Sequence, residues 1–286
     1  MNKYYEEIKE LREADEFIKV IEKWNTLSEN MGKVNIKNIP IFLPDMFLVA
    51  RSGVGRTKLI RLMSEFLYSA GNLMDFYGDV KFFEFLLAYC AKGEPFTELQ
   101  RLMYEMQNAQ GFRNEFKGVI HIDVTEWLRH YEEPHFISFM EYISSFSEKI
   151  MIVLSVTDTE SESLADFEAF ISMYLRLEIV KLSLPSTETL VEHAKKNLSA
   201  YGFCLSEGGE RLIFDTVDTL RKNKYFDGYK TIQMLCQDIV YSVFTRGAAQ
   251  NSILCEDILS EFSADSDYVK RTSVRIERAK RIGFNA

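Results

Sequence analysis

The stretch VARSGVGRTKLIRLM, residues 49–63, carries residue types that could bind phosphate. A phosphate-binding loop follows the pattern G-x-x-x-x-G-K-[ST] between a buried strand and a helix. Gly55 and Thr57 fit this pattern, whereas Ala50 stands at the first glycine and Arg56 at the lysine. The planar guanidinium of an arginine keeps the positive charge but does not act as a compact point charge. The stretch alone therefore leaves a nucleotide site and a coincidental glycine-rich turn equally open.

The backbone of this loop could bind anions even where its side chains depart from the pattern. N–H groups of a glycine-rich turn and of the following helix surround anionic oxygens. The candidate nucleotide-binding residues are Ser52, Gly53, Val54, Gly55, Arg56, Thr57 and Lys58. We predict that the 52–57 turn connects a strand to a helix.

A second motif contains a carboxylate that could hold a metal ion. The segment GVIHIDVTEWL, residues 118–128, is an apolar strand that ends in Asp123. At the tip of a neighbouring strand, such an aspartate holds Mg²⁺ together with the hydroxyl of the loop threonine, here Thr57. The alternative is a strand-end aspartate that only caps the next turn.

The elements that would position these residues alternate between short apolar runs and helical patterns. We predict strands over 46–50, 80–87, 117–123, 149–156 and 176–183, with a helix not excluded for 80–87. We predict helices over 57–71, 96–110, 135–147 and 163–175. Such alternation predicts an α/β fold in which a parallel sheet is sandwiched by helices.

Three domains are predicted along the chain. Residues 1–32 contain one amphipathic helix, over 3–31, and residues 33–184 form the α/β domain. The pattern changes at Pro185, and residues 185–286 are predicted to be helical, with Ser186 as the first cap. The basic tail over 269–284 is expected to be a solvated helix face.

The composition excludes several classes of function. At 47% hydrophobic residues the chain can bury a large core, and no apolar run is long enough to span a membrane. The start lacks the apolar segment of a signal peptide, and the four scattered cysteines predict buried, reduced thiols, so we expect a cytoplasmic protein. The four histidines lack metal-ligand spacing, and a net charge of −9 argues against general nucleic-acid binding.

Taken in order, these motifs resemble those of the AAA+ ATPases, and most closely the branch that contains the red-type rubisco activators. LVARSGVGRT is similar to the loop of that branch, F-T-G-N-P-G-T-G-K-T, and GVIHIDVT to its second motif, G-V-L-F-I-D-E-A. Further on, IMIVLSVTD, the pair Arg176-Leu177 and FDGYKTIQ (226–233) resemble the later motifs. The resemblance covers about residues 40–260.

The resemblance implies a P-loop NTPase-type sheet followed by an all-helical lid, with ATP or ADP and Mg²⁺ as ligands. It implies that Thr57 and Asp123 hold the metal and that Arg176 is an arginine finger reaching into a neighbour's site. Lys230 falls on the lid residue that senses the γ-phosphate, and Thr157 or Asp158 lies near a residue that positions water. Plain surface or solvated cations remain open alternatives for Arg176 and Lys230.

The departures from the family concern hydrolysis. Val124 occupies the place of the glutamate that activates water, and Glu126, two residues on, is the only nearby substitute. Tyr89 could serve in a substrate-gripping loop, although the surrounding pattern is absent. We therefore expect a subunit of a homo- or hetero-oligomer with AAA+ subunits that binds ATP or ADP and hydrolyses ATP weakly or not at all. An active ATPase that remodels a protein partner and a nucleotide-free scaffold are the alternatives.

Overall fold

The computed structural model describes most of the chain, in two compact units. The described residues are 3–9, 11–34, 43–70, 82–87, 97, 100, 119–146, 150–157, 161–247, 252–253, 255–259, 268 and 271. The first unit contains residues 1–51 and 56–183, and the second contains 52–55 and 184–286. The helix expected over 96–110 and the basic tail lie outside the described residues, apart from isolated positions.

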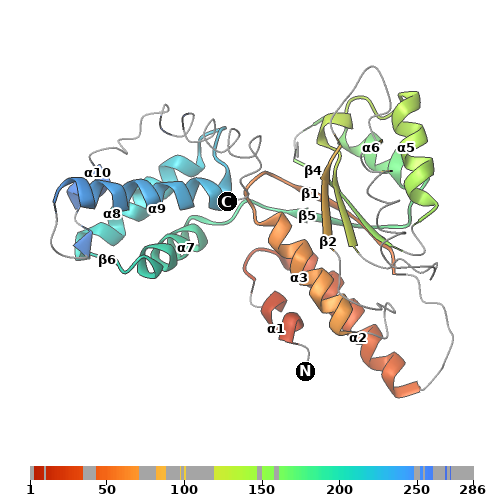
Figure 1. Cartoon of the computed structure of the whole chain (residues 1–286), viewed down its shortest axis with the longest axis horizontal. Helices are drawn as coiled ribbons and strands as arrows, with labels where there is room; N and C mark the ends of the chain where they lie inside the picture. The colour runs from red at the N-terminus through yellow and green to blue at the C-terminus, as the bar shows by residue number, and fades with distance from the viewer. Residues whose placement is uncertain are drawn as a thin grey trace. The chain divides into compact units, whose positions relative to one another are not determined.

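A five-stranded parallel sheet forms the centre of the first unit (Figure 1). Its strands, in the spatial order β2-β3-β4-β1-β5, are β1 (Asp45–Ala50), β2 (Phe82–Leu86), β3 (Val119–Asp123), β4 (Met151–Val156) and β5 (Leu177–Leu182). Every residue of β1 and β4 is buried, as expected for central strands covered on both faces. Within the segment 80–87, whose sequence pattern left strand and helix open, Phe82–Leu86 form a strand.

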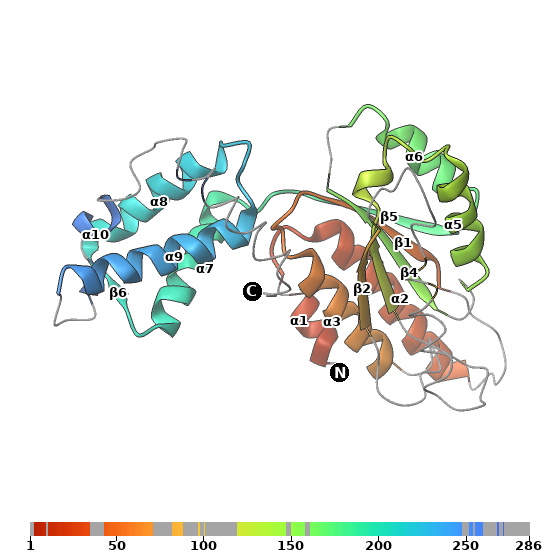
Figure 2. The same ribbon diagram turned by 45° about the horizontal axis from the view of Figure 1, so that its top comes forward.

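Helices cover both faces of this sheet (Figures 1 and 2). On one face lie α5 (Pro134–Ser144) and α6 (Leu164–Ile171), whose phenylalanines pack against β1, β3 and β4 in one apolar cluster. On the other face lie α1 (Lys3–Lys9), α2 (Asp15–Val34) and α3 (Arg56–Ser69). The short 3₁₀ helix η1 (Thr125–Trp127) directly follows β3.

The single helix predicted over 3–31 is in fact two helices, α1 and α2. The chain turns between them at Glu13, which has a positive φ of 61°. Helix α2 then runs along the edge strand β5, where Glu16 Oε2 accepts a hydrogen bond of 2.7 Å from Lys181 N and Lys23 forms an ion pair with Glu178. These contacts cover a sheet edge whose backbone groups would otherwise be exposed to pairing by another chain.

The second unit is built from helices around its own apolar core. The helices are α7 (Thr187–Ala200), α8 (Glu207–Arg221), α9 (Gly228–Thr245) and α10 (Cys255–Leu259), and their leucine, isoleucine and valine side chains form one cluster. The predicted cap is confirmed, since Ser186 Oγ accepts from Thr189 N at 3.2 Å. A two-residue parallel pair, β6 (Cys204–Leu205) with β7 (Ser252–Ile253), is the only strand pairing among the described residues of 184–286.

Two expectations from composition can be compared with these units. No helix among the described residues is both long enough and apolar enough to span a membrane. Three of the cysteines are described, and all three are free thiols. Cys236 is buried, and burial raises the pKa of its thiol to about 12. Cys204, however, is exposed, so the prediction that all the cysteines are buried is wrong at this position.

Candidate functional site

The candidate loop follows the carboxyl end of β1, at the point where the strand order of the sheet reverses. β1 lies between β4 and β5, although the next strand in sequence, β2, lies at the far edge. In open parallel sheets, ligands bind beyond the carboxyl ends of the strands at such a point. Asp123 is the last residue of β3, and Thr157 directly follows β4. Both therefore lie at the carboxyl ends of the strands, as the loop does.

The loop itself is a turn between a strand and a helix, as predicted. Gly53 and Gly55 have positive φ values of 78° and 87°, a conformation that favours glycine, and Arg56 begins α3. The first N–H groups of α3 have no acceptor within their own helix. Val54 is buried and Lys58 is exposed on α3.

Residues 52–55 pack within the second unit, at the start of α9. Gly53 O accepts a hydrogen bond of 2.8 Å from Tyr229 N. A Cβ atom at Gly53 would lie 1.9 Å from Asp227 O, and one at Gly228 would lie 2.3 Å from Gly53 O. Neither position can carry a side chain without moving the backbone.

Arg56 pairs with the carboxylate that the sequence assigns to a metal. Its Nη2 lies 2.6 Å from Asp123 Oδ2, and its Nη1 donates to Ser155 Oγ at 2.9 Å. The Arg56 and Asp123 side chains are only 17% and 15% exposed. Burial raises the pKa of Asp123, but the charge of Arg56 and hydrogen bonds from Thr125 outweigh it, so the net pKa is below its usual value. Asp123 is therefore an ionised partner of Arg56.

Thr57 is engaged with a different carboxylate, which the sequence analysis missed. Its Oγ1 donates to Glu84 Oε1 at 2.7 Å, and the same Glu84 oxygen lies 3.1 Å from His121 Nδ1. The hydrogen bond from His121, with that from Thr57, lowers the pKa of Glu84 to about 2. A signal was present in the sequence, because Glu84 and His121 are polar residues in the middle of apolar strands, FFEFL and VIHID.

Hydrogen bonds close a ring from Arg56 through Ser155, His121 and Glu84 to Thr57. His121 Nε2 lies 2.8 Å from Ser155 Oγ, and its Nδ1 faces Glu84. Because an ionised carboxylate only accepts, His121 Nδ1 donates its proton to Glu84 Oε1 in this contact. Ser155 Oγ in turn accepts from Arg56. The ring fastens the first turn of α3 to three strands.

Ser155, His121 and Glu84 stand in the order of a nucleophile, a base and an orienting acid. Ser155 and His121, however, are both fully buried. Arg56 also donates to Ser155 Oγ, which leaves that oxygen a poor nucleophile. The arrangement is therefore a structural network and not a hydrolytic triad.

The second oxygen of Asp123 caps the next turn, as the alternative interpretation predicted. Asp123 Oδ1 accepts from Thr125 N at 3.0 Å and from Thr125 Oγ1 at 2.5 Å. Thr125 Oγ1 in turn accepts from Thr157 N at 2.9 Å, which joins the ends of β3 and β4. Asp158 and Tyr89 lie outside the described residues.

Each predicted magnesium ligand is thus engaged within the protein. Both oxygens of Asp123 accept hydrogen bonds, and the Thr57 hydroxyl donates to Glu84. Among the described residues, no group of three or more histidine, cysteine, aspartate or glutamate side chains is placed to hold a metal ion. As arranged, these residues do not fit Mg²⁺, which requires a nearly octahedral set of oxygen ligands.

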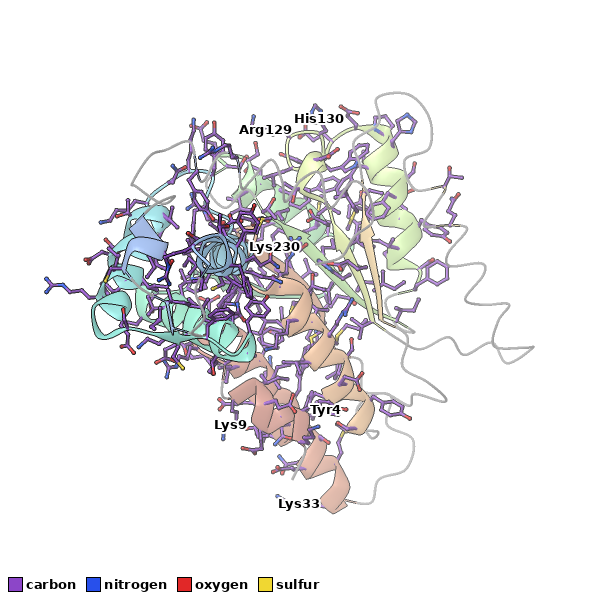
Figure 3. The ribbon with its side chains drawn as sticks, turned by 60° about the vertical axis from the view of Figure 1, so that its left-hand side comes forward. Tyr4, Lys9, Lys33, Arg129, His130 and Lys230 are labelled. Atoms are coloured by element: carbon purple, nitrogen blue, oxygen red, sulfur yellow. The ribbon has the colours of Figure 1, made fainter. Side chains whose placement is uncertain are left out.

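The residues expected to act in hydrolysis lie apart from this network. Val124 is fully buried in the core of the first unit, and Glu126 is exposed on η1. Arg176 is exposed just before β5, at the amino end of the strand, because Leu177 pairs with Asp45 at the start of β1. Arg176 therefore lies at the amino ends of the strands, whereas the loop lies at their carboxyl ends. Lys230, labelled in Figure 3, lies partly buried in the first turn of α9 in the second unit.

Comparison with known proteins identifies the fold. No protein-family model matches the chain, and no curated protein matches it in sequence. The structure of C. elegans PCH-2 is similar with a TM-score of 0.53 at 13% identity, over 92% of this chain and 70% of that one. Weaker similarities include domain III of the Thermotoga maritima replication initiation protein DnaA (TM-score 0.46, 14% identity, 83% of this chain and 90% of that one). Another is the Thermotoga maritima RuvB Holliday junction branch migration motor (TM-score 0.45, 13% identity, 90% of this chain and 68% of that one).

These proteins are AAA+ ATPases, and the likeness to PCH-2, with the parallel sheet and its flanking helices, shows an AAA+ P-loop NTPase fold. At this identity it shows the fold alone, and it does not test the narrower resemblance to the red-type rubisco activators.

Proposed function

We propose that this protein is a nucleotide-binding subunit of an AAA+-type assembly that binds ADP or ATP at the 52–58 loop and hydrolyses ATP slowly or not at all. The observation that carries the proposal is the ion pair between Arg56 and Asp123, 2.6 Å apart, directly at the start of the loop's helix. It places the Arg56 guanidinium beside the loop and occupies a carboxylate that metal-dependent hydrolysis would need.

Support for binding comes from the backbone of the loop. Gly53 and Gly55 adopt the positive φ values that a turn around anionic oxygens needs. The N–H groups at the start of α3, beginning at Arg56, add the partial positive charge of a helix N-terminus. These donors do not depend on the side chains that depart from the pattern.

Support for slow hydrolysis comes from the position after Asp123. An attacking water needs a group that accepts its proton, and the loss of such a group costs about 10²–10⁴-fold in rate. Val124 cannot accept a proton and is buried in the core, and Thr125 donates to Asp123 Oδ1. Glu126 is exposed on η1.

Support for an assembly comes from Arg176. A strand length separates it from the loop that follows β1 in its own sheet. Its exposure leaves it available to a neighbouring subunit, where it would approach that subunit's nucleotide. Lys230 lies near the start of α9, next to Tyr229, whose N–H donates to Gly53 O of the loop, and it would respond to a nucleotide bound at that loop.

The proposal is tested by calorimetric titration with ADP and ATP, alongside measurement of phosphate release. We expect saturable binding of both nucleotides that is lost in Gly55→Val, because valine is strained at a φ of 87°. Arg61→Ala, an exposed change on the same helix, is the matched control and should bind normally.

Two results would contradict the proposal. Brisk magnesium-dependent hydrolysis that Asp123→Asn abolishes would favour an active ATPase. No binding of either nucleotide at millimolar concentration would favour a nucleotide-free scaffold.

A further inference from the structure

We propose that the guanidinium of Arg56 takes the place of a divalent cation at Asp123, so that this site binds the metal-free form of a nucleoside di- or triphosphate. The inference rests on the nucleotide binding proposed above. Its central claim, that Arg56 excludes a divalent cation, is also testable without any nucleotide.

Both carboxylate oxygens of Asp123 already have partners within the protein. Oδ2 lies 2.6 Å from Arg56 Nη2, and Oδ1 accepts two hydrogen bonds from Thr125. A magnesium ion would approach such an oxygen to about 2.1 Å. The guanidinium already lies against Oδ2, so a metal there would place two cations against one carboxylate oxygen.

The two expected metal ligands, Thr57 and Asp123, contact different partners. Thr57 Oγ1 donates to Glu84 of β2, whereas Asp123 of β3 pairs with Arg56. A single Mg²⁺ requires its oxygen ligands at near-ideal octahedral positions. Bringing Thr57 and Asp123 onto one ion would break both interactions.

Two contacts hold the guanidinium of Arg56 in place. Besides Asp123, it donates through Nη1 to Ser155 Oγ at 2.9 Å. Ser155 is fully buried and is itself bonded to buried His121. Withdrawing the guanidinium would leave a buried hydroxyl and a mostly buried carboxylate short of a hydrogen-bond donor, which is unfavourable. The built-in cation is thus not easily displaced by a dissolved one.

The inference predicts how magnesium changes affinity. The loop's N–H groups would meet the phosphates directly, and these donors need no metal. Magnesium binds nucleotides in solution and so lowers the concentration of the metal-free form. We expect ADP to bind the unmodified protein at least as tightly in EDTA as in millimolar Mg²⁺, by equilibrium dialysis. Tighter binding in Mg²⁺ would overturn the inference.

A second experiment uses Mn²⁺ alone, followed by electron paramagnetic resonance. We expect no Mn²⁺ site in the unmodified protein, a site in Arg56→Ala, and loss of that site in Arg56→Ala with Asp123→Asn. Arg56→Gln, which keeps a donor for Ser155, provides a second variant in case the alanine variant does not fold. Arg61→Ala is the control and should resemble the unmodified protein.

The outcomes separate the two proposals. If ADP binds in neither condition, the proposed function fails, and the Mn²⁺ experiment decides the inference by itself. Mn²⁺ bound by the unmodified protein and lost in Asp123→Asn would overturn it. It would also be overturned if a folded Arg56 variant gained no Mn²⁺ site, because Arg56 would then not be what excludes the metal.

Discussion

At the scale of single residues, His121 is the centre of the polar network. It lies fully buried in β3 and contacts both Glu84 and Ser155. Two groups depend on it, and a buried polar group left without a partner costs about 1–3 kcal/mol. The network is therefore a stability feature as well as a boundary of the candidate site.

We predict that His121→Ala lowers the free energy of unfolding by about 2–4 kcal/mol, from the lost hydrogen bonds and the cavity together. The measurement is urea denaturation followed by circular dichroism. His135→Ala, half-buried in the first turn of α5, is the matched control and should cost less than about 1 kcal/mol. Equal costs for the two variants would show that the ring contributes nothing.

Val124 gives a second prediction at this scale. The motif comparison suggests that Val124→Glu with Arg56→Lys would restore hydrolysis. Val124 is fully buried in an apolar cluster, however, so a glutamate there would place a carboxylate in the core. We expect Val124→Glu to destabilise the protein by at least about 3 kcal/mol in urea denaturation, without a gain in phosphate release.

Val124→Thr is the control for that experiment. Threonine has nearly the same shape and no charge, and should cost about 1–3 kcal/mol. A folded Val124→Glu protein with raised phosphate release would restore the interpretation from the sequence.

At the scale of elements, Asp45 joins the two central strands. It begins β1 and accepts a hydrogen bond of 2.7 Å from Ile152 N in β4. Burial raises the pKa of its carboxyl group to about 7, against the opposing effect of that hydrogen bond. The folded protein therefore binds this proton more tightly than the unfolded chain does. The contribution of Asp45 to the free energy of unfolding is largest below about pH 4 and falls as the pH rises to about 7.

We predict that Asp45→Asn removes this decline, because the amide oxygen still accepts from Ile152 and does not ionise. Between pH 5 and pH 8, the urea midpoint of the unmodified protein should fall by more than that of the variant. Each unit of pKa shift corresponds to about 1.4 kcal/mol in the free energy of unfolding. Asp15→Asn, an exposed carboxylate in the first turn of α2, should leave the pH profile unchanged. Parallel profiles for Asp45→Asn and the unmodified protein would contradict the assignment.

The loop gives a prediction at the same scale. Its control separates the strain of a positive φ from the steric clash of an added Cβ atom. Gly53 and Gly247 have similar φ values of 78° and 73°. A Cβ at Gly53 would overlap Asp227 O, whereas one at Gly247 would meet nothing within 4 Å. Gly247→Ala should cost about 1 kcal/mol in backbone strain, and Gly53→Ala clearly more. Amide exchange at Tyr229 should rise only in Gly53→Ala, because Gly53 O is its acceptor.

These elements also show what the sequence could and could not predict. The five strands and the loop were predictable, because apolar runs, glycines and the residues Thr57 and Asp123 are local signals. Which side chains face one another was not, because the register that pairs Glu84 with His121 depends on how distant strands align. The break between α1 and α2 was not predicted. Glu13 has a left-handed backbone conformation there, which glutamate rarely adopts, so its residue type gave no signal of a turn.

At the scale of the whole molecule, each unit has its own apolar core. One is built on the sheet with α5 and α6, and the other on α7, α8, α9 and α10. Proteins with separate cores often unfold in more than one step. We predict two calorimetric transitions. Ile152→Ala should lower one and Val217→Ala the other, since each is buried in a different core. A single transition lowered equally by both variants would show that the units unfold as one.

The assignment of Ser52–Gly55 to the second unit affects how this protein can be divided into fragments. The chain passes between the units three times, after Arg51, after Gly55 and after Ser183. A fragment beginning at Leu184 would contain all the helices of the second unit but would lack the carbonyl that accepts from Tyr229 N. A fragment ending at Ser183 would keep the loop but without the backbone that it packs against. Neither half on its own reproduces the native surroundings of the four residues that join β1 to α3.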